Sequence, residues 1–247
     1  MIDEYWASIS GGKDSYYMLE FILNNLDKYR LDGVIHFELE IDYPFVKDII
    51  NEIKTKCENM CIKFISIKPR KSWEELYNKY GFPSRTNRWC NSAYKLDAKN
   101  QFIKFKKSLG SNIYFYIGYC KDEEKRYINR PLNEIYPLVE NNIYENDVLK
   151  WARIKKIYKD YYLINNRLGC MYCPITSYLN LAYLKLYFPK NYSYMLNKIK
   201  ETEISVSQKL GRKYTIRGKK YDWQYIDYIV DKKYINKILE KVNNYDK

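Results

Sequence analysis

Hydrophobic and polar residues follow two different periods along the first 160 residues. Short apolar runs of strand length alternate with stretches in which apolar residues recur at helical spacing. Such alternation is typical of a parallel sheet, because parallel strands need crossover connections between them. The pattern predicts an α/β fold with a doubly wound, mostly parallel sheet. The predicted strands are 5–9, 33–39, 61–67 and 113–119, and the predicted helices are 16–23, 45–57, 73–77, 91–107 and 145–157.

From Ser177 onward the strand pattern stops and only helical spacing remains. The helical stretches are 179–187, 194–210 and 223–242. No internal repeat or low-complexity linker interrupts the chain. We therefore predict a nucleotide-binding sheet domain over residues 1–174 and a helical, basic appendage over residues 175–247.

Composition limits the cellular setting. No apolar stretch approaches the roughly 20 residues that span a bilayer, and the start, MIDEYW, lacks the basic and apolar regions of a signal peptide. These features predict a cytoplasmic protein with no membrane partner. Its six cysteines are then expected to be thiols or metal ligands rather than disulfides.

The formal net charge is +13, and the basic residues are unevenly spread. The segment 209–220 holds six Lys or Arg and no acid, and four further lysines stud the predicted helix 91–107. Such patches fit a polyanion such as tRNA or DNA. An ordinary solvated basic surface is the alternative, because the chain is rich in lysine throughout. The four helical lysines are Lys99, Lys104, Lys106 and Lys107.

The stretch Ser8–Ser15, with the sequence SISGGKDS, lies between the first strand and the first helix. A glycine-rich turn there directs backbone N–H groups and the helix dipole at one point, which suits a phosphate group. Lys13 adds a mobile positive charge, and Asp14 either positions Mg²⁺ or orders the loop. The loop is not a Walker A motif, since Ala7 and Asp14 stand where that motif needs Gly and Ser or Thr. The predicted nucleotide-binding residues of this loop are Ser8, Ser10, Gly11, Gly12, Lys13, Asp14 and Ser15.

The SGGKDS stretch resembles the PP-loop of the ATP pyrophosphatases, a superfamily with the adenine nucleotide alpha hydrolase-like fold. Two later segments resemble motifs of its phosphoadenylylsulfate (PAPS) reductase family, in the same order along the chain. They are Arg-Trp-Cys followed by Lys, and a Gly-x-x-x-Asp-Glu-x-x-Arg pattern in which Cys120 stands where the family usually has Arg. The resemblance covers about residues 5–174. It implies nucleotide contacts from Arg88, Lys95, Gly118, Asp122, Glu123 and Arg126.

The third group of interest is Cys170-Met-Tyr-Cys173-Pro174. This spacing fits a redox dithiol, half of a zinc site, iron–sulfur ligation, or chance. A metal site needs about four soft ligands, and the single histidine, His36, lies in a strand where packing is the expected role. Further ligands must then be cysteines. Cys90, Cys120, Cys170 and Cys173 are the predicted set, holding a [4Fe–4S] cluster or zinc; the resemblance to thiolation enzymes of the PP-loop type favours the cluster.

Arg85, Arg88 and Lys95 surround Cys90 in sequence, which favours its thiolate and attracts phosphate or sulfate. The resemblance implies an ATP-dependent enzyme that adenylylates a substrate for sulfur transfer, as in tRNA or DNA thiolation. Cys90, Asp14 and Lys13 are the predicted catalytic residues. Expected partners are an adenine nucleotide with Mg²⁺, the nucleic acid, a sulfur-donor protein and a second copy in a homodimer.

Two other functions stay open. A sulfonucleotide reductase with an atypical thiol is one, although no cysteine follows Cys173, where reductases of the family carry theirs. A nucleotide-binding module without catalytic activity is the other.

Overall fold

A computed structural model describes residues 1–129, 131–217 and 222–245. The chain forms two compact units. The first contains Met1–Arg70 and Lys95–Tyr162 and is called the sheet unit below; the second contains Lys71–Tyr94 and Leu163–Lys247 and is called the helical unit.

The sheet unit is built on five strands in the order β3-β2-β1-β4-β5, and every neighbouring pair is parallel. The predicted doubly wound α/β fold is thus confirmed. The chain passes from β1 outward to β3 and then returns to β1's other side at β4, and ligands bind such sheets where the order reverses. The strands are β1 (Ile2–Ile9), β2 (Gly33–Phe37), β3 (Phe64–Ile67), β4 (Ser111–Tyr116) and β5 (Glu134–Ile135).

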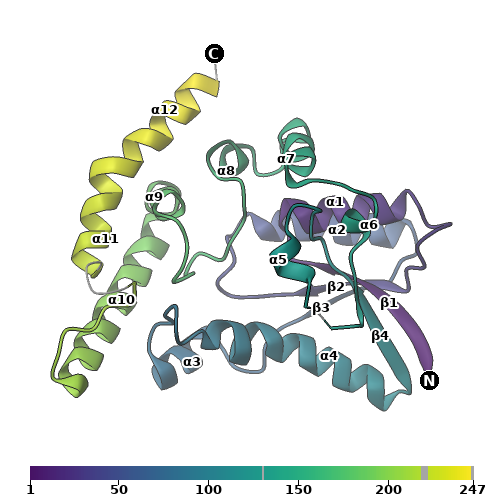
Figure 1. Cartoon of the computed structure of the whole chain (residues 1–247), viewed down its shortest axis with the longest axis horizontal. Coiled ribbons are helices and arrows are strands. Elements are labelled where there is room, and N and C mark those ends of the chain that lie inside the picture. The colour runs from purple at the N-terminus through teal and green to yellow at the C-terminus, as the bar shows by residue number, and fades with distance from the viewer. Residues whose placement is uncertain (130, 218–221, 246–247) are drawn as a thin grey trace. The chain divides into compact units, whose positions relative to one another are not determined.

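Helices cover both faces of this sheet. In Figure 1, α1 and α2 lie on one face and α4 lies on the other, while α7 packs on the outer side of α1. Both faces are therefore buried, which explains why the strands read as nearly continuous apolar runs. The helices of the sheet unit are α1 (Lys13–Leu23), α2 (Val46–Asn59), α4 (Leu96–Ser108), α5 (Glu124–Tyr127), α6 (Pro137–Glu140) and α7 (Glu145–Ile154), and α8 (Lys159–Ile164) begins in it.

Aromatic residues fill the core between the sheet and α4. Trp6 of β1 is fully buried and meets Phe102 of α4 edge-on, with 4.9 Å between ring centroids. Phe115 of β4 joins the same cluster. Edge-to-face aromatic pairs add to the stabilisation that their buried area provides.

Two of the four lysines expected on a basic patch are instead used inside the sheet unit. Lys106 is buried, pairs with Glu4 at 2.5 Å and lies over the Trp6 ring. Lys99 pairs with Glu134 at 2.8 Å. The expectation that all four lysines face a polyanion is therefore wrong, because carboxylates on the strands draw these two ammonium groups inward.

Three helices of the helical unit, α3, α9 and α11, begin at a capping side chain. Ser72, Ser177 and Asp222 each accept a backbone N–H of the first turn, as good N-cap residues do. Residues 223–242, predicted as one helix, form α11, a π-helical segment and α12 in succession. The helices are α3 (Trp73–Tyr80), α9 (Tyr178–Tyr187), α10 (Pro189–Leu210), α11 (Trp223–Ile229), η2 (Val230–Ile235) and α12 (Asn236–Tyr245).

The two compact units do not follow the predicted boundary between residues 174 and 175, since residues 71–94 belong with the C-terminal helices. The physical reason is a set of contacts between α3 and α10. Glu74 pairs with Lys198 at 2.7 Å, and the Tyr77 hydroxyl donates to Glu201 at 2.7 Å. These partners lie more than 120 residues apart in the chain, so no local pattern announces them.

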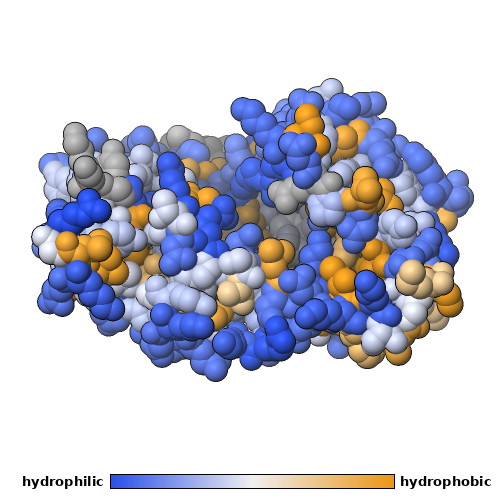
Figure 2. All heavy atoms as spheres, turned by 60° about the horizontal axis from the view of Figure 1, so that its bottom comes forward, coloured by the Kyte–Doolittle hydropathy of each residue, from blue (hydrophilic) through white to orange (hydrophobic). Residues whose placement is uncertain are grey.

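Hydrophilic side chains predominate on the face of the molecule shown in Figure 2, and apolar ones gather there only in separate small patches. No helix in the described part of the chain has the length and apolar character needed to cross a membrane. The last residues of the predicted basic segment 209–220, from Gly218 onward, lie outside the described residues.

Candidate functional site

The glycine-rich loop (Ser8–Ser15) connects β1 to α1 at the carboxyl end of the sheet. Gly11 has a φ of 77°, in the region that glycine adopts without strain. A Cβ added to Gly11 would also lie 2.5 Å from Cγ1 of Val46. Both constraints reserve this position for glycine, and they keep the backbone of the loop open to a ligand.

Hydrogen bonds within the loop hold its shape. The Ser15 hydroxyl donates to the Gly12 carbonyl at 3.0 Å and accepts the Ser10 amide at 3.2 Å. The Ser10 hydroxyl lies 3.2 Å from that of Ser15. These two hydroxyls, predicted to face phosphate, thus also order the loop that carries the amides.

Lys13 does not carry the mobile charge that the sequence suggested. Its side chain is fully buried, with its ammonium group 2.6 Å from Asp14 and 3.3 Å from Glu145. Burial raises the pKa of Asp14, Lys13 opposes that rise, and the nearby carboxylates of Glu123 and Glu145 add to it. Lys13 is therefore a cation with a fixed position where the loop meets α1, paired with the two carboxylates of Asp14 and Glu145.

Two tyrosines that sequence reasoning missed close over the loop. The Tyr162 hydroxyl accepts the Lys13 backbone amide at 2.7 Å, and the Tyr158 hydroxyl donates to the Gly11 carbonyl at 2.9 Å. Glu145 was likewise missed as a partner of Lys13. The chain holds 29 tyrosines, so nothing in the sequence singled out these two.

The Tyr162 contact matters because first-turn amides are the groups that bind anions at a helix N-terminus. A phosphate oxygen would need the Lys13 amide that Tyr162 now holds. We expect Tyr162→Phe to bind ATP more tightly by about fivefold, since one hydrogen bond of roughly 1 kcal/mol no longer has to be broken. Isothermal titration calorimetry measures this affinity.

Tyr116→Phe is the matched control, because it also removes one buried hydroxyl, which donates to the Arg30 carbonyl and does not contact the loop. Its ATP affinity should equal that of the wild type. Equal or weaker ATP binding by Tyr162→Phe would show that the hydroxyl does not compete with phosphate.

The segment after β4 packs directly against the loop. A Cβ at Gly118 would lie 2.6 Å from the Asp14 carbonyl oxygen, closer than real Cβ atoms come. Glu123 accepts the Cys120 amide at 3.2 Å and pairs with Arg126 at 2.7 Å. Asp122 accepts the Glu145 amide at 3.0 Å, which fixes the start of α7. These predicted nucleotide residues all help to shape the site from within the sheet unit.

The close approach at Gly118 gives a stability test. Gly118→Ala should lower the free energy of unfolding by roughly 1–3 kcal/mol, because backbone rather than a flexible side chain must shift. Gly169→Ala is the control, since a Cβ there would have no heavy atom within 4 Å. Chemical denaturation of both variants measures the difference; similar values would contradict the role given to Gly118.

Cys120 lies in this same acidic corner. Its thiol is buried, 3.8 Å from the Asp14 carboxylate. Burial, together with the charges of Asp14 and Glu123, raises the pKa of the Cys120 thiol. Metal ligation needs the thiolate, which the carboxylates of Asp14 and Glu123 disfavour here. Ligation by Cys120 stays a prediction.

The other three predicted ligands lie in the helical unit. Cys90 is buried at the start of the π-helical segment η1 (Cys90–Lys95), while Cys170 and Cys173 are partly exposed in one turn, where the Cys173 amide donates to the Cys170 carbonyl at 3.3 Å. All six cysteines are thiols. Among the described residues, no three Cys, His, Asp or Glu form a group that could hold a metal ion. The four-cysteine site stays a prediction, and no step below depends on it.

The remaining predicted residues occupy ordinary places in the fold. Ser8 pairs with Ile35 in the β1–β2 ladder. Arg88 is exposed, and its carbonyl accepts the Asn91 amide as the π-helical segment begins. Lys95 ends that segment. Their contact with a nucleotide stays a prediction.

A pocket of about 380 Å³ opens beside the glycine-rich loop, at the carboxyl ends of β2 and β3. It adjoins the loop through Val46, which contacts Gly11, and through His36, whose Nδ1 lies 2.9 Å from the Ile9 carbonyl oxygen. Burial lowers the pKa of His36, so the ring is a neutral part of the wall, as its place in a strand predicts.

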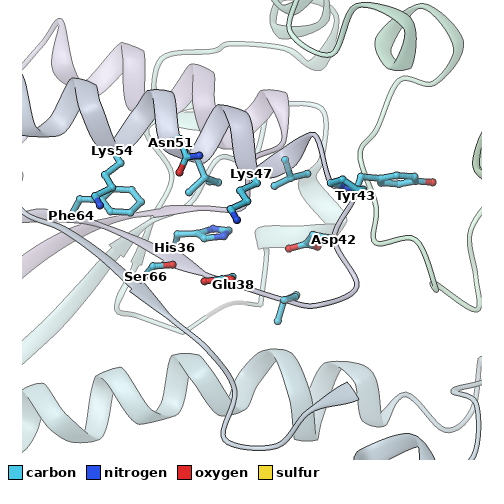
Figure 3. Close-up of a pocket in the computed structure, with 13 residues that line it drawn as sticks. His36, Glu38, Asp42, Tyr43, Lys47, Asn51, Lys54, Phe64 and Ser66 are labelled. Carbon is cyan, nitrogen blue, oxygen red and sulfur yellow. The ribbon is translucent and has the colours of Figure 1, made fainter. Parts of the chain in front are cut away.

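The pocket combines apolar walls with a few polar groups, the usual character of a small-molecule site. Figure 3 shows the imidazole of His36, the ammonium group of Lys47 and the carboxylate of Asp42 around one open space. Apolar surface comes from both α2 and β3. The apolar wall residues include Leu39, Pro44, Val46, Ile50 and Phe64.

Comparison with known families agrees with this geometry. The model of the phosphoadenosine phosphosulfate reductase domain matches residues 4–175 of the chain. The chain belongs to this family. The resemblance predicted over residues 5–174 is thereby confirmed, and the glycine-rich loop, Gly118 and the Cys170–Cys173 pair all lie within the matched region of the reductase-domain family.

Two curated relatives of this family member come from Methanocaldococcus jannaschii. The uncharacterised protein MJ0973 is 27% identical over 192 residues, which cover 73% of this chain and 43% of the relative. The uncharacterised protein MJ0066 is 25% identical over 208 residues, which cover 79% of this chain and 41% of the relative. The chain thus spans less than half the length of either relative.

Among solved structures, the chain is similar to the U34-tRNA thiolase NcsA from Methanococcus maripaludis, described with its [4Fe-4S] cluster. The identity is 14% and the TM-score is 0.40, over 81% of this chain and 71% of the other.

Proposed function

We propose that this protein cleaves ATP between the α- and β-phosphates and uses the adenylyl group to activate an oxygen of a nucleic-acid base for replacement by sulfur. The observation that carries the proposal is the glycine-rich loop together with the adjoining 380 Å³ pocket. Val46 lines the pocket and also lies against Gly11 of the loop, so the pocket and the loop adjoin. A nucleoside that fills the pocket would therefore have its phosphates at the loop.

Residues of the loop supply the positioning and charge that such phosphoryl chemistry needs. The amides at the start of α1 bind the β- and γ-phosphates, and buried Lys13 faces the charge that grows on the pyrophosphate as it leaves. The acceptor oxygen forms a bond to the α-phosphorus, and the bond from that phosphorus to the bridging oxygen breaks. Pyrophosphate departs with the bonding electrons.

The second half of the reaction replaces oxygen by sulfur. A sulfur-donor protein leaves a persulfide on one of two cysteines, and the outer sulfur of this persulfide attacks the activated carbon, so that AMP leaves with the original oxygen. The second cysteine then attacks the inner sulfur, which releases the thiolated base and leaves a disulfide that an external thiol reduces. Cys170 and Cys173 are partly exposed thiols in one turn of the family region. They are our proposed handlers of that sulfur, because the thiolate is the reactive form of cysteine and exposure gives it access.

Pyrophosphate release tests the first half. Purified protein, ATP, Mg²⁺ and unmodified tRNA or single-stranded DNA should release pyrophosphate, measured by a coupled pyrophosphatase assay, in an amount equal to the adenylylated nucleic acid. AMP should appear only after a sulfur donor is added. Release of orthophosphate and ADP would contradict cleavage at the α-phosphorus. Release of sulfite from an adenylylsulfate compound would identify a reductase instead, and tight ATP binding without turnover would identify a binding module.

A substitution that fills the pocket tests where the nucleoside binds. Ser66 lines the pocket from β3 and its side chain is exposed, so Ser66→Trp adds a large ring without disturbing the core. We expect ATP binding to weaken at least tenfold. Ser66→Ala, which removes the hydroxyl and fills nothing, should bind ATP as the wild type does. Unchanged affinity of Ser66→Trp in calorimetry would place the nucleoside elsewhere.

A further inference from the structure

A second cavity, of about 440 Å³, lies within the helical unit. It is formed by the segment that follows the Cys170–Cys173 turn, by a loop after α3 and by the region after α10. Its volume is within the range of small-ligand sites. No described residue that lines it is Asp or Glu. The polar and aromatic lining residues are Arg85, Thr176, Ser177, Tyr178, Arg217 and Tyr234.

Arg217 is held rigidly at this cavity and is only partly satisfied. Its Nε donates to the Pro174 carbonyl at 3.1 Å, and one terminal nitrogen donates to the Thr176 carbonyl. Its other terminal nitrogen is buried and has no hydrogen-bond partner among the described residues. An unpaired buried donor costs on the order of 1–3 kcal/mol, so an acceptor that enters the cavity would recover that free energy.

A second cation and a helix end add to the positive character of the cavity. Burial lowers the pKa of Arg217, whereas Tyr178 and Cys173 oppose that change and the charge of Arg85 adds to it. Arg85 and Arg217 both line the cavity, so two guanidinium groups face the same space. Ser177 caps α9 by accepting the Asn180 amide at 3.1 Å, so the positive end of that ten-residue helix lies at the cavity. The cavity therefore favours an anion.

Aromatic rings give the cavity a flat wall. Tyr178 and Tyr234 stack with 5.6 Å between centroids, and the Arg217 guanidinium lies 5.0 Å from the Tyr178 ring. Tyrosine rings and arginine planes are the surfaces on which proteins stack unpaired bases. A cation pair beside an aromatic wall matches a ligand with both a phosphate and a base.

The cavity also adjoins a proposed sulfur-handling thiol. Arg217 and Pro174 line a small neighbouring hollow together with Cys173, and the charge of Arg217 acts on that thiol group. We propose that this cavity holds one phosphorylated nucleotide, with its base on the Tyr178–Tyr234 wall and its phosphate between Arg85 and Arg217. This rests on the proposed function, for which the cavity would be the place where the acceptor strand is gripped next to Cys173.

Binding of a fluorescent single-stranded oligoribonucleotide of eight residues to the full chain tests the proposal. Saturating α,β-methylene-ATP is added so that the glycine-rich loop is filled. We expect Arg85→Gln to weaken binding by three- to tenfold and to reduce the salt dependence by about one phosphate contact. Arg217→Gln should weaken it more, and Arg217→Lys, which keeps the charge, should recover part of the loss.

Arg85→Gln is the decisive variant, because Arg85 is exposed, whereas Arg217 also holds two carbonyl groups in place. Lys190→Gln is the matched control, since Lys190 is an exposed cation in the same unit, does not line the cavity and lies outside the basic segment 209–220. It should bind as the wild type does. Equal binding by Arg85→Gln, Lys190→Gln and the wild type would overturn the proposal.

Competition by uridine monophosphate distinguishes two ligands of the cavity, a free nucleotide and a nucleotide within a strand. If the mononucleotide displaces the oligonucleotide and depends on Arg85 to do so, the cavity takes free nucleotides. If only the strand binds through Arg85, it takes a nucleotide within a chain. The oligonucleotide assay measures binding and not catalysis, so its result does not depend on pyrophosphate release. Loss of the Arg85 effect would overturn the cavity proposal alone, and absence of pyrophosphate release would overturn the proposed function alone.

Discussion

Lys13→Met should reduce pyrophosphate release from ATP by about 10²–10³-fold, the usual cost of losing one preorganised group that stabilises developing charge. Lys13 is the fully buried cation of the glycine-rich loop, and Asp14 and Glu145 fix its position. Methionine keeps the length of the side chain and removes only the charge. Steady-state pyrophosphate release, with ATP affinity measured separately, gives the effect on each step.

The same substitution leaves the carboxylates around Lys13 without their cation, so the free energy of unfolding should also fall, by roughly 3–5 kcal/mol. Thermal unfolding therefore accompanies each assay, and Lys13→Arg, which keeps the charge, is the second variant. Lys150→Met, on the exposed surface of α7, is the control and should change nothing. A folded Lys13→Met enzyme with wild-type turnover would remove Lys13 from the mechanism.

Replacing both Cys170 and Cys173 by Ser should separate the two half-reactions. Sulfur incorporation into the nucleic acid, measured by mass spectrometry, should be lost, because a serine hydroxyl cannot serve as a sulfur carrier. Pyrophosphate release should stay within about twofold, since the loop and pocket proposed to bind ATP lie in the sheet unit. The two thiols belong to the helical unit.

Cys61→Ser is the control for this pair, because Cys61 is an exposed thiol in the sheet unit, away from the loop. It should retain both activities. Sulfur incorporation by the double variant at the wild-type rate would exclude these thiols as the sulfur-handling groups. Loss of pyrophosphate release as well would show that the turn has a structural role in both steps.

The sheet unit was largely predictable because its signals are local. Strand and helix periods alternate in the first 70 residues, and a glycine-rich turn after β1 marks the ligand edge. Strand ends were less predictable: Cys61 was placed in β3, yet it has a φ of 55° in the turn before that strand. An apolar residue such as Cys61 adds the same signal to the hydrophobic pattern whether it stands in the turn or in the strand. Hydrophobic periodicity alone therefore does not locate the first residue of the strand.

The chemistry around the loop was less predictable, because it depends on distant partners. Lys13 lies 132 residues from Glu145 and 149 residues from Tyr162, and no periodicity connects them. The burial of Lys106 likewise depends on Glu4, 102 residues away. Counting charges in a sequence overstates a basic surface wherever ion pairs of this kind form in the fold.

The Tyr162 hydroxyl has a consequence for selectivity. It competes with phosphate for the Lys13 backbone amide. Because Tyr162 is part of the same chain, its effective concentration at this amide does not fall when the protein is diluted. A small anion that offers the loop only one acceptor gains little by replacing a partner already in place. Under the proposed function ATP gains more, because its nucleoside would also fill the pocket beside Val46. The loop is thereby biased against the free phosphate of the cell and toward ligands that bind at two points.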